Sequence, residues 1–139
     1  MSEDCIFCRI AAGAAPASVV AETSDALAFM DLDQPTPGHV LVIPRCHVRD
    51  IYEMEAEVAA SVFKLTVQVA KAVKLALAPD GLTLIQANER AGQQHVFHFH
   101  MHIVARYSGD GDRVRLGWKT NLPASSELDR LAAKIRASL

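Results

Sequence analysis

A row of alternating histidines constrains the fold of this chain more than any other feature of its sequence. His98, His100 and His102 stand at every second position, separated by Phe99 and Met101. In a β-strand successive side chains point to opposite faces, so the three imidazoles would share one face while their apolar neighbours enter a core. Alternate residues of a strand lie about 6.5 Å apart, which lets one small substrate touch two of the three. An α-helix would scatter them, so the sequence predicts a strand here.

Two interpretations of this row compete. Alternating histidines could form a solvent-facing strand or an incidental metal-binding tract. However, the other three histidines, His39, His47 and His95, also lie in local sequences with an ordered pattern. Imidazole titrates near neutral pH and serves as a nucleophile, a proton carrier and a metal ligand. We therefore interpret the row as a reactive site.

The composition is that of an ordinary globular domain. The chain has 139 residues, 50% of them apolar, and a formal net charge of −2. This length predicts one domain with a real core, and the lack of a basic excess argues against nucleic-acid binding. No apolar run is long enough to cross a membrane, and the acidic first four residues do not resemble a secretory signal. Since three cysteines, an odd number, argue against a disulfide framework, we expect a cytoplasmic protein that binds no membrane.

The remaining pattern predicts an α+β domain. Short apolar stretches bounded by breaker residues predict strands at residues 19–22, 26–31, 39–44 and 82–87. Apolar residues at helical spacing predict one long helix over residues 55–78, and a C-terminal helix is expected over residues 125–139. Because strands and helices do not alternate regularly, we expect an antiparallel sheet of about five strands, with helices on one face and the other face open for chemistry.

Cys5 and Cys8 form a Cys-x-x-Cys pair at the start of the chain. Such a pair alone is compatible with a redox pair, half of a metal site or coincidence. A thioredoxin-like pair would follow a strand and open a helix, which this terminus does not supply. Half of a zinc site fits better, provided that two further ligands lie elsewhere. His47, at the exit of a predicted strand, could be a surface residue or one of those ligands.

The histidine row resembles the signature of the histidine triad (HIT) family, His-x-His-x-His followed by apolar residues. The resemblance extends from Cys5 to about Arg106 and is weak beyond it. It implies a single HIT-like domain over residues 1–139, with an N-terminal zinc-binding segment (1–17) and a family-variable tail (107–139). It also implies a homodimer, joined through the helix at 55–78 or the strand at 82–87.

The resemblance gives the middle of the row a catalytic role. His100 would attack the α-phosphorus of a nucleotide and become transiently nucleotidylated, and water would then release the nucleotide. His102 would reach the phosphate oxygens or the leaving group. His39 matches a histidine that borders the same pocket. Gln94 matches a glutamine that contacts the phosphate or the scissile bond, although hydrogen bonding within its loop is the alternative.

Five further residues match positions that bind the substrate in the family. Phe29 and Leu32 would flank the base, and Phe29 is equally compatible with core packing. Asp31 would bind the ribose hydroxyls, which suits a carboxylate. Asn88 matches an asparagine of the same site, again with loop hydrogen bonding as the alternative. His95 stands where the family often has a serine or threonine, and it could donate a proton to the leaving group or point outward.

His98 has a different predicted role. Together with Cys5, Cys8 and His47 it makes a set of two thiols and two imidazoles, which suits tetrahedral zinc. Some bacterial members of the family carry zinc on this pattern. One structural Zn²⁺ per chain is therefore expected, with free cysteines as the alternative.

The sequence also departs from the family at Gln93, where a glycine is common.

The resemblance implies an enzyme that hydrolyses nucleoside 5′-monophosphate derivatives, namely purine nucleoside phosphoramidates and adenylates, through a nucleotidyl-histidine intermediate. A dinucleoside polyphosphate hydrolase is the alternative within the family. An alternative of another class is a zinc-stabilised nucleotide-binding interaction protein. Sugar-nucleotide transfer is disfavoured, because that branch has a glutamine in place of His102.

Overall fold

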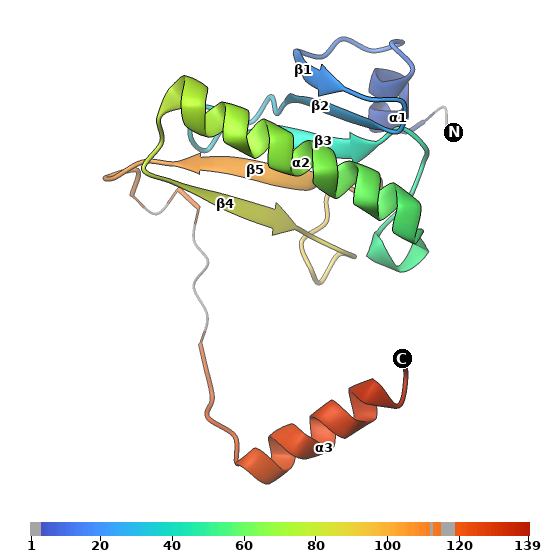
Figure 1. Cartoon of the computed structure of the whole chain (residues 1–139), viewed down its shortest axis with the longest axis vertical. Coiled ribbons are helices and arrows are strands. Elements are labelled where there is room, and N and C mark those ends of the chain that lie inside the picture. The colour runs from blue at the N-terminus through green and yellow to red at the C-terminus, as the bar shows by residue number, and fades with distance from the viewer. Residues whose placement is uncertain (1–3, 112, 115–118) are drawn as a thin grey trace.

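A five-stranded antiparallel sheet forms the centre of the chain in a computed structural model that describes residues 4–111, 113–114 and 119–139 (Figure 1). Its strand order is β1-β2-β3-β5-β4. The strands are β1 (Val19–Glu22), β2 (Ala26–Met30), β3 (Val40–Pro44), β4 (Gly81–Gln86) and β5 (Met101–Arg106). The predicted α+β class and strand number are confirmed. The predicted segments 1–17 and 107–139 each include residues outside the described set.

One long helix, α2 (Ala56–Leu77), covers one face of the sheet. It buries Val62, Leu65, Val69 and Val73 against side chains such as Val42. These helical residues recur every three or four positions, which places them on one side of the helix. The short 3-10 helix η1 (Ile51–Glu53) leads into α2. The predicted long helix is confirmed to within one residue at each end.

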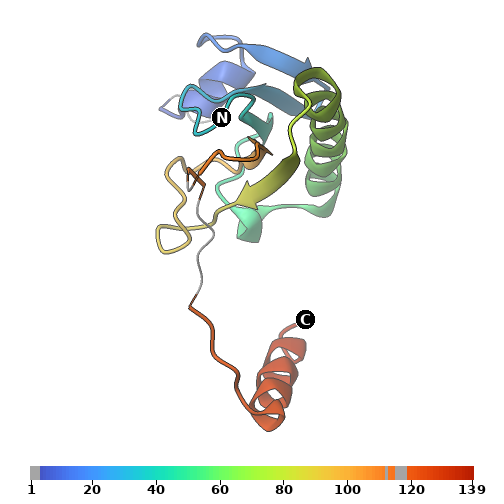
Figure 2. The same ribbon diagram turned by 90° about the vertical axis from the view of Figure 1, so that its left-hand side faces the viewer.

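The opposite face is covered over part of its width by a short helix, α1 (Ile6–Ala11). Phe7 of α1 packs with Leu27, Phe29, Leu41 and Ile43 in a second apolar cluster. Figure 2 shows α1 and α2 on opposite sides of the sheet. The expectation of helices on one face only is therefore wrong. Alternation along β3 explains why, since Val40 and Val42 face α2 while Leu41 and Ile43 face the other side.

The strand predicted for the histidine row begins later than expected. β5 starts at Met101, so only His102 of the three histidines lies in a strand. The ladder with β3 ends at Met101, beyond which Phe99 N–H donates to the carbonyl of Val48. The carbonyl of His98 is used by the ring of His100 instead of a neighbouring strand. At His98 and Phe99, hydrogen bonds to a loop carbonyl and to the His100 ring thus replace the hydrogen bonds of a strand ladder.

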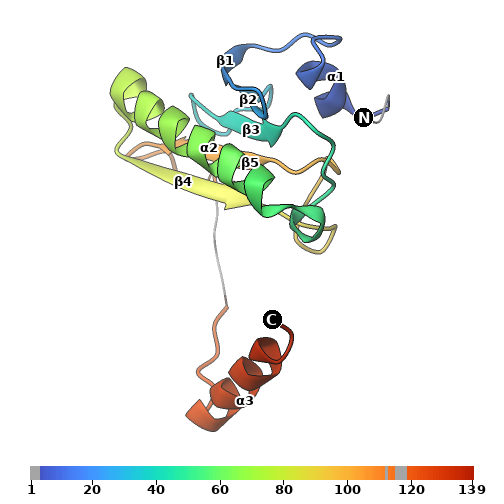
Figure 3. The ribbon, with the colours of Figure 1, turned by 45° about the vertical axis from the view of Figure 1, so that its right-hand side comes forward.

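The C-terminal helix, α3 (Ser125–Arg136), buries none of its residues. It lies apart from the sheet and beyond β4 in two views (Figures 1 and 3). Its apolar residues Leu128, Leu131 and Ile135 are exposed. The helix was expected to pack on the sheet, and this expectation is wrong. No helix among the described residues is both long and apolar enough to span a membrane.

Candidate active site and metal centre

A cavity of about 320 Å³ opens on the face of the sheet opposite α2. It brings together the predicted substrate residues Phe29, Asp31, Leu32 and His95 with the predicted catalytic residues His100 and His102. A second hollow of about 500 Å³ adjoins it and adds His39, Asp33 and Arg113. Asp31, Gln93, His95 and His102 line both spaces. The first cavity, an apolar slot, and the second, a polar hollow, therefore meet at His102.

His100 is held with one ring nitrogen occupied and the other available. Its Nδ1 lies 2.7 Å from the carbonyl oxygen of His98. A carbonyl only accepts, so Nδ1 carries the proton and Nε2 keeps its lone pair. Burial lowers the pKa of His100, although the bond to the His98 carbonyl opposes this. At neutral pH the ring is thus uncharged and nucleophilic.

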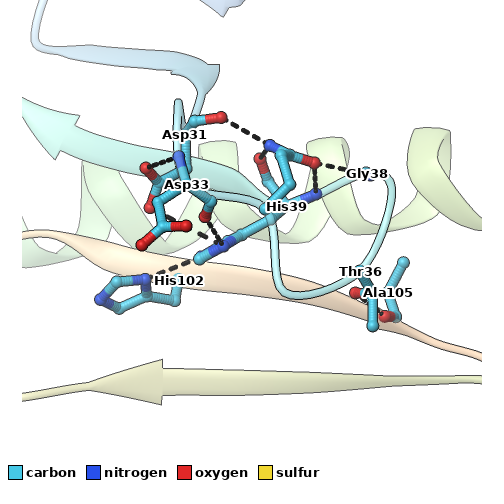
Figure 4. Close-up of polar contacts among 8 residues, drawn as sticks. Asp31, Asp33, Thr36, Gly38, His39, His102 and Ala105 are labelled. Carbon is cyan, nitrogen blue, oxygen red and sulfur yellow. Dashed lines mark hydrogen bonds and ion pairs between the residues drawn. The ribbon is translucent and has the colours of Figure 1, made fainter. Parts of the chain in front are cut away.

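His102 pairs with His39 across β3 and β5. Nε2 of His39 lies 2.8 Å from Nδ1 of His102, and Figure 4 shows the two rings meeting beside Asp31 and Asp33. On its far side, Nδ1 of His39 lies 3.3 Å from the carbonyl oxygen of Asp33 and 3.7 Å from Oδ2 of Asp31. Burial, followed by the neighbouring His100 and His39, lowers the pKa of His102 to about 4. The predicted catalytic pair is therefore assembled and backed by a carboxylate.

The loop that carries Asp31 is fixed by Gln34, which sequence reasoning missed. The side chain of Gln34 accepts from the backbone N–H groups of Gly38 and His39 and donates to the carbonyls of Asp31 and His39 (Figure 4). Gly38 has φ +97°, and a Cβ there would overlap Leu77. The only signal in the sequence was the density of breaker residues in this loop.

Gln94 and Asn88 do not line either space. Gln94 is buried, accepting from Glu89 N–H and donating to the carbonyls of Arg49 and Val96. The amide of Asn88 accepts from Ile51 N–H and exchanges hydrogen bonds with Gln86. Both side chains therefore follow the loop-bonding alternative, and Gln94 shapes the loop that presents His95.

Gln93 occupies the position where the family commonly has glycine, and its backbone explains that preference. Its φ is +69°, in the left-handed region that non-glycine residues rarely adopt. The same turn places the side chain of Gln93 beside His95 at the rim of both spaces. This departure from the family therefore adds a polar side chain next to the cavity.

The four predicted metal ligands converge on one point. Their ligand atoms all lie within 4.8 Å of one another. Sγ of Cys8 lies 3.2 Å from Nδ1 of His47, and both Cys5 and Cys8 place Sγ 3.5 Å from Nδ1 of His98. Two sulfurs and two imidazole nitrogens in this arrangement fit tetrahedral zinc. The third cysteine, Cys46, is exposed and lies outside the cluster.

The tautomer of His98 suits this role. Its Nε2 donates to the carbonyl oxygen of Pro44 at 2.9 Å, so the lone pair is on Nδ1, facing the two sulfurs. A carbonyl that orients a ligating histidine in this way is typical of metal sites. Burial lowers the pKa of His98 to about 4, which keeps the ring neutral and able to coordinate.

Sequence reasoning missed the contribution of α1 to the cavity. Ile6, Phe7 and Ile10 of this helix line the apolar slot. The ring of Phe7 also contacts the ring of Phe29, with centroids 5.5 Å apart. The signal was present in the sequence, since two of these apolar residues lie between Cys5 and Cys8. A segment predicted only to hold metal also forms a wall.

A HIT domain model matches residues 12–109. The chain belongs to the histidine triad family. It is 42% identical to Protein hit of Bacillus subtilis over 120 residues, which are 86% of this chain and 82% of that protein. It is 32% identical to adenosine 5′-monophosphoramidase hnt1 of Schizosaccharomyces pombe over 135 residues, 97% and 98% of the two chains.

Solved structures of this HIT family have the same fold. A HIT family protein from Bacillus anthracis superposes with a TM-score of 0.94 at 35% identity, covering 100% of this chain and 99% of that one. A Zn-bound histidine triad family protein from Mycobacterium smegmatis superposes with a TM-score of 0.74 at 31% identity, covering 98% of each chain.

Proposed function

We propose that this HIT protein hydrolyses nucleoside 5′-monophosphate derivatives at the α-phosphorus, with His100 as the nucleophile. The observation that carries the proposal is the state of the His100 ring. Its Nδ1 is tied to the His98 carbonyl, its pKa is lowered by burial, and it lines the cavity. A neutral imidazole with one free nitrogen is the form that attacks phosphorus.

The cavity has room and polarity for a nucleoside. At about 320 Å³ it lies at the lower end of the range for small-molecule sites. Apolar side chains of α1 and Phe29 would enclose the purine, with Leu32 at the rim. The carboxylate of Asp31 would accept from the two ribose hydroxyls. A nucleoside bound in this way would direct its 5′-phosphate toward His100 and His102.

The reaction would proceed in two displacements. Nε2 of His100 forms a bond to phosphorus while the bond to the leaving group breaks, and the leaving group takes a proton from His102. Water then attacks phosphorus, the bond to His100 breaks, and His102 accepts a proton from the water. The nucleoside monophosphate leaves and both histidines are restored.

We favour phosphoramidates and adenylates as substrates over dinucleoside polyphosphates. A relative that matches 97% of this chain is named as an adenosine 5′-monophosphoramidase. The polar hollow of about 500 Å³ beside His102 would receive the leaving group. His95 and Arg113 line this hollow, so an anionic polyphosphate remains the alternative.

We also propose one structural zinc ion per chain, held by Cys5, Cys8, His47 and His98. The convergent ligand set and a relative described as Zn-bound support it. Bound zinc would supply a crosslink between the N-terminal segment and the sheet. Four protein ligands leave no open position for substrate, so the ion would take no part in the reaction.

A homodimer is proposed on similar grounds. Strand β4 is at the edge of the sheet and pairs only with β5 within the described part of the chain. Leu84 on β4 and Phe63 and Val67 on α2 are exposed apolar residues. A second copy pairing through these elements would cover both the open strand edge and the apolar side chains.

The test is turnover of a substrate panel by purified protein. An adenosine 5′-phosphoramidate, an aminoacyl adenylate and a diadenosine polyphosphate are compared by release of AMP. We expect the fastest release from the phosphoramidate and none from the His100→Ala variant. Binding of AMP without turnover of any compound would instead support the nucleotide-binding interaction protein. Equal turnover by His100→Ala would contradict the proposal.

A further inference from the structure

The histidine pair His39–His102 is bounded by acceptors at one end. Nδ1 of His39 faces the carbonyl oxygen of Asp33 and the carboxylate of Asp31, at 3.3 and 3.7 Å. Neither group can donate a hydrogen bond when Asp31 is ionised. Nδ1 of His39 must therefore carry a proton.

This requirement fixes the tautomer of His102 in the neutral pair. With its single proton on Nδ1, His39 offers a lone pair at Nε2. The 2.8 Å contact between that nitrogen and Nδ1 of His102 then needs a proton on His102 Nδ1. The remaining nitrogen of His102, Nε2, is left with a lone pair on the side away from His39 (Figure 4).

A lone pair is the wrong group to meet a phosphate. Phosphate oxygens are acceptors, so His102 would repel the substrate anion instead of binding it. Moving both protons within the pair would supply N–H at Nε2 of His102. It would, however, leave Nδ1 of His39 bare against Asp33 and the Asp31 carboxylate. Neither neutral form satisfies both ends, whereas one additional proton does.

We propose that binding of the substrate's anionic phosphate makes the His39–His102 pair take up one proton, which is then the proton given to the leaving group; this rests on the function proposed above. His39 is a positioning residue in this scheme, because it dictates which nitrogen of His102 is protonated. The Asp31 carboxylate stabilises the cationic pair from behind, as a carboxylate does behind a catalytic histidine.

The surrounding charges fit a pair that is neutral when free and charged when occupied. Burial lowers the pKa of His102 to about 4, so His102 carries no extra proton at pH 7 without ligand. An incoming phosphate anion supplies the compensating charge. The titratable and charged groups that line these spaces near the pair are Asp31, Asp33, His95, His100 and Arg113.

Proton uptake would remove the need for an outside acid during turnover. When His100 attacks, the bond from phosphorus to nitrogen breaks and Nε2–H of His102 protonates the departing amine. The pair is then neutral, and the exposed lone pair of His102 Nε2 accepts the proton of the attacking water. The acquired proton leaves with the product's release, so each cycle balances.

Isothermal titration calorimetry in buffers of different ionisation enthalpy measures the proton directly. The ligand is an adenosine 5′-methylphosphonate monoester, which has one acidic group and stays a monoanion. It is preferred to AMP because the second pKa of a phosphate monoester, about 6, would add proton exchange of the ligand's own. We expect uptake of about one proton per site at pH 7.5, and an affinity that falls about tenfold for each pH unit of increase. Adenosine, which lacks the anion, should bind with no uptake.

Two variants identify the site of the proton. His39→Phe removes the residue that dictates the tautomer, so neutral His102 can present Nε2–H, and the anion should bind without uptake. His95→Gln, which changes another histidine lining both spaces, should keep the uptake. No uptake in the unaltered protein, unchanged uptake in His39→Phe, or its loss in His95→Gln would each overturn the proposal. Failure of both ligands to bind would contradict the proposed nucleotide site itself.

Discussion

The ring of Phe7 stands edge-on to the ring of His100, with centroids 5.2 Å apart and planes at 82°. Phe7 lies between Cys5 and Cys8 on helix α1, so the segment that carries two of the proposed metal ligands also touches the proposed nucleophile. The same ring contacts the ring of His98, a third proposed ligand, with centroids 5.9 Å apart. The proposed metal centre and the candidate substrate cavity therefore share a wall.

Loss of zinc should weaken nucleotide binding. We expect the unaltered protein to carry close to one zinc per chain, and Cys8→Ser to lose it while keeping some turnover. Because α1 would no longer be held, the affinity for AMP should fall by about tenfold, the lower end of what perturbed metal sites cost. Elemental analysis and titration with AMP measure both effects. Cys46→Ser is the matched control and should change neither; protein made with zinc available but containing none would refute the metal site.

Substitution of the proposed nucleophile should separate binding from chemistry. His100→Ala should abolish turnover and still bind nucleotide, because Asp31 and the apolar slot remain. His102→Ala should slow turnover by about 10²–10⁴-fold, the usual worth of proton transfer. Protein quenched in base during turnover of a phosphoramidate should carry a nucleotidyl group on His100, mapped by mass spectrometry. An adduct on another residue would show that the mechanism is wrong.

His95 should influence which bond is cleaved. Its side chain lines both the nucleoside cavity and the adjoining polar hollow, so it can reach a leaving group. We expect His95→Ala to change the ratio of phosphoramidate to polyphosphate cleavage by several-fold, within the range expected for one proton-transfer or charge contact. Gln93→Gly is the control, because it removes a neighbouring side chain and suits the left-handed backbone. Identical ratios in all three proteins would mean that His95 serves only the solvent side.

Acid should destabilise the metal-free protein through buried histidines. The pKa values of His98 and His102 are each lowered from 6.5 to about 4, chiefly by burial. Between pH 6.5 and pH 4, therefore, these two histidines are protonated in the unfolded chain but neutral in the folded chain. This stability is present above pH 6.5 and is lost as the pH falls toward 4. For His98 the loss is about 2 kcal/mol between pH 7.5 and 5.

Urea denaturation with a chelator and a reductant measures this effect. His102→Asn should show a shallower dependence on pH than the unaltered protein, since one of the two groups is removed. A free energy of unfolding that stays constant from pH 7.5 to 5 would contradict the assignment of neutral, buried rings.

The edge at β4 should hold two copies together. Leu84→Lys places a charge on the exposed apolar side of this edge strand and should convert a dimer to a monomer at micromolar concentration, as light scattering would show. Val20→Lys makes the same change on β1, the opposite edge, and should leave the mass unchanged. A monomeric mass for the unaltered protein would contradict the proposed dimer.

The sequence predicted what depends on local periodicity. The apolar run at residues 39–44 predicted a strand and the helical spacing along residues 58–73 predicted a helix with one buried face, and the structure has both elements. The resemblance to the HIT family added four predicted metal ligands, and the structure brings these residues together. The strand and helix predictions were correct because the burial of each residue there follows from the periodicity of its own strand or helix.

What the sequence did not predict depends on contacts between distant segments. His39 and His102 meet because Leu41 pairs with His102 in the β3–β5 register, which no local pattern reveals. The start of β5 is displaced because the His98 carbonyl bonds to a ring. Gln94 and Asn88 carry amides that could equally face a phosphate or a loop, and only the positions of Glu89 and Ile51 decide it.

Helix α3 has 12 residues and buries none of them, so its backbone hydrogen bonds are not shielded by packing against the described part of the domain. Isolated helices of this length are marginal in water. The amides of α3 in a single chain should therefore exchange with deuterium about as fast as those of a free peptide, while those of β3 and β5 wait for unfolding of the whole domain. Helix α3 thus unfolds as a different cooperative unit from the sheet that carries the histidines.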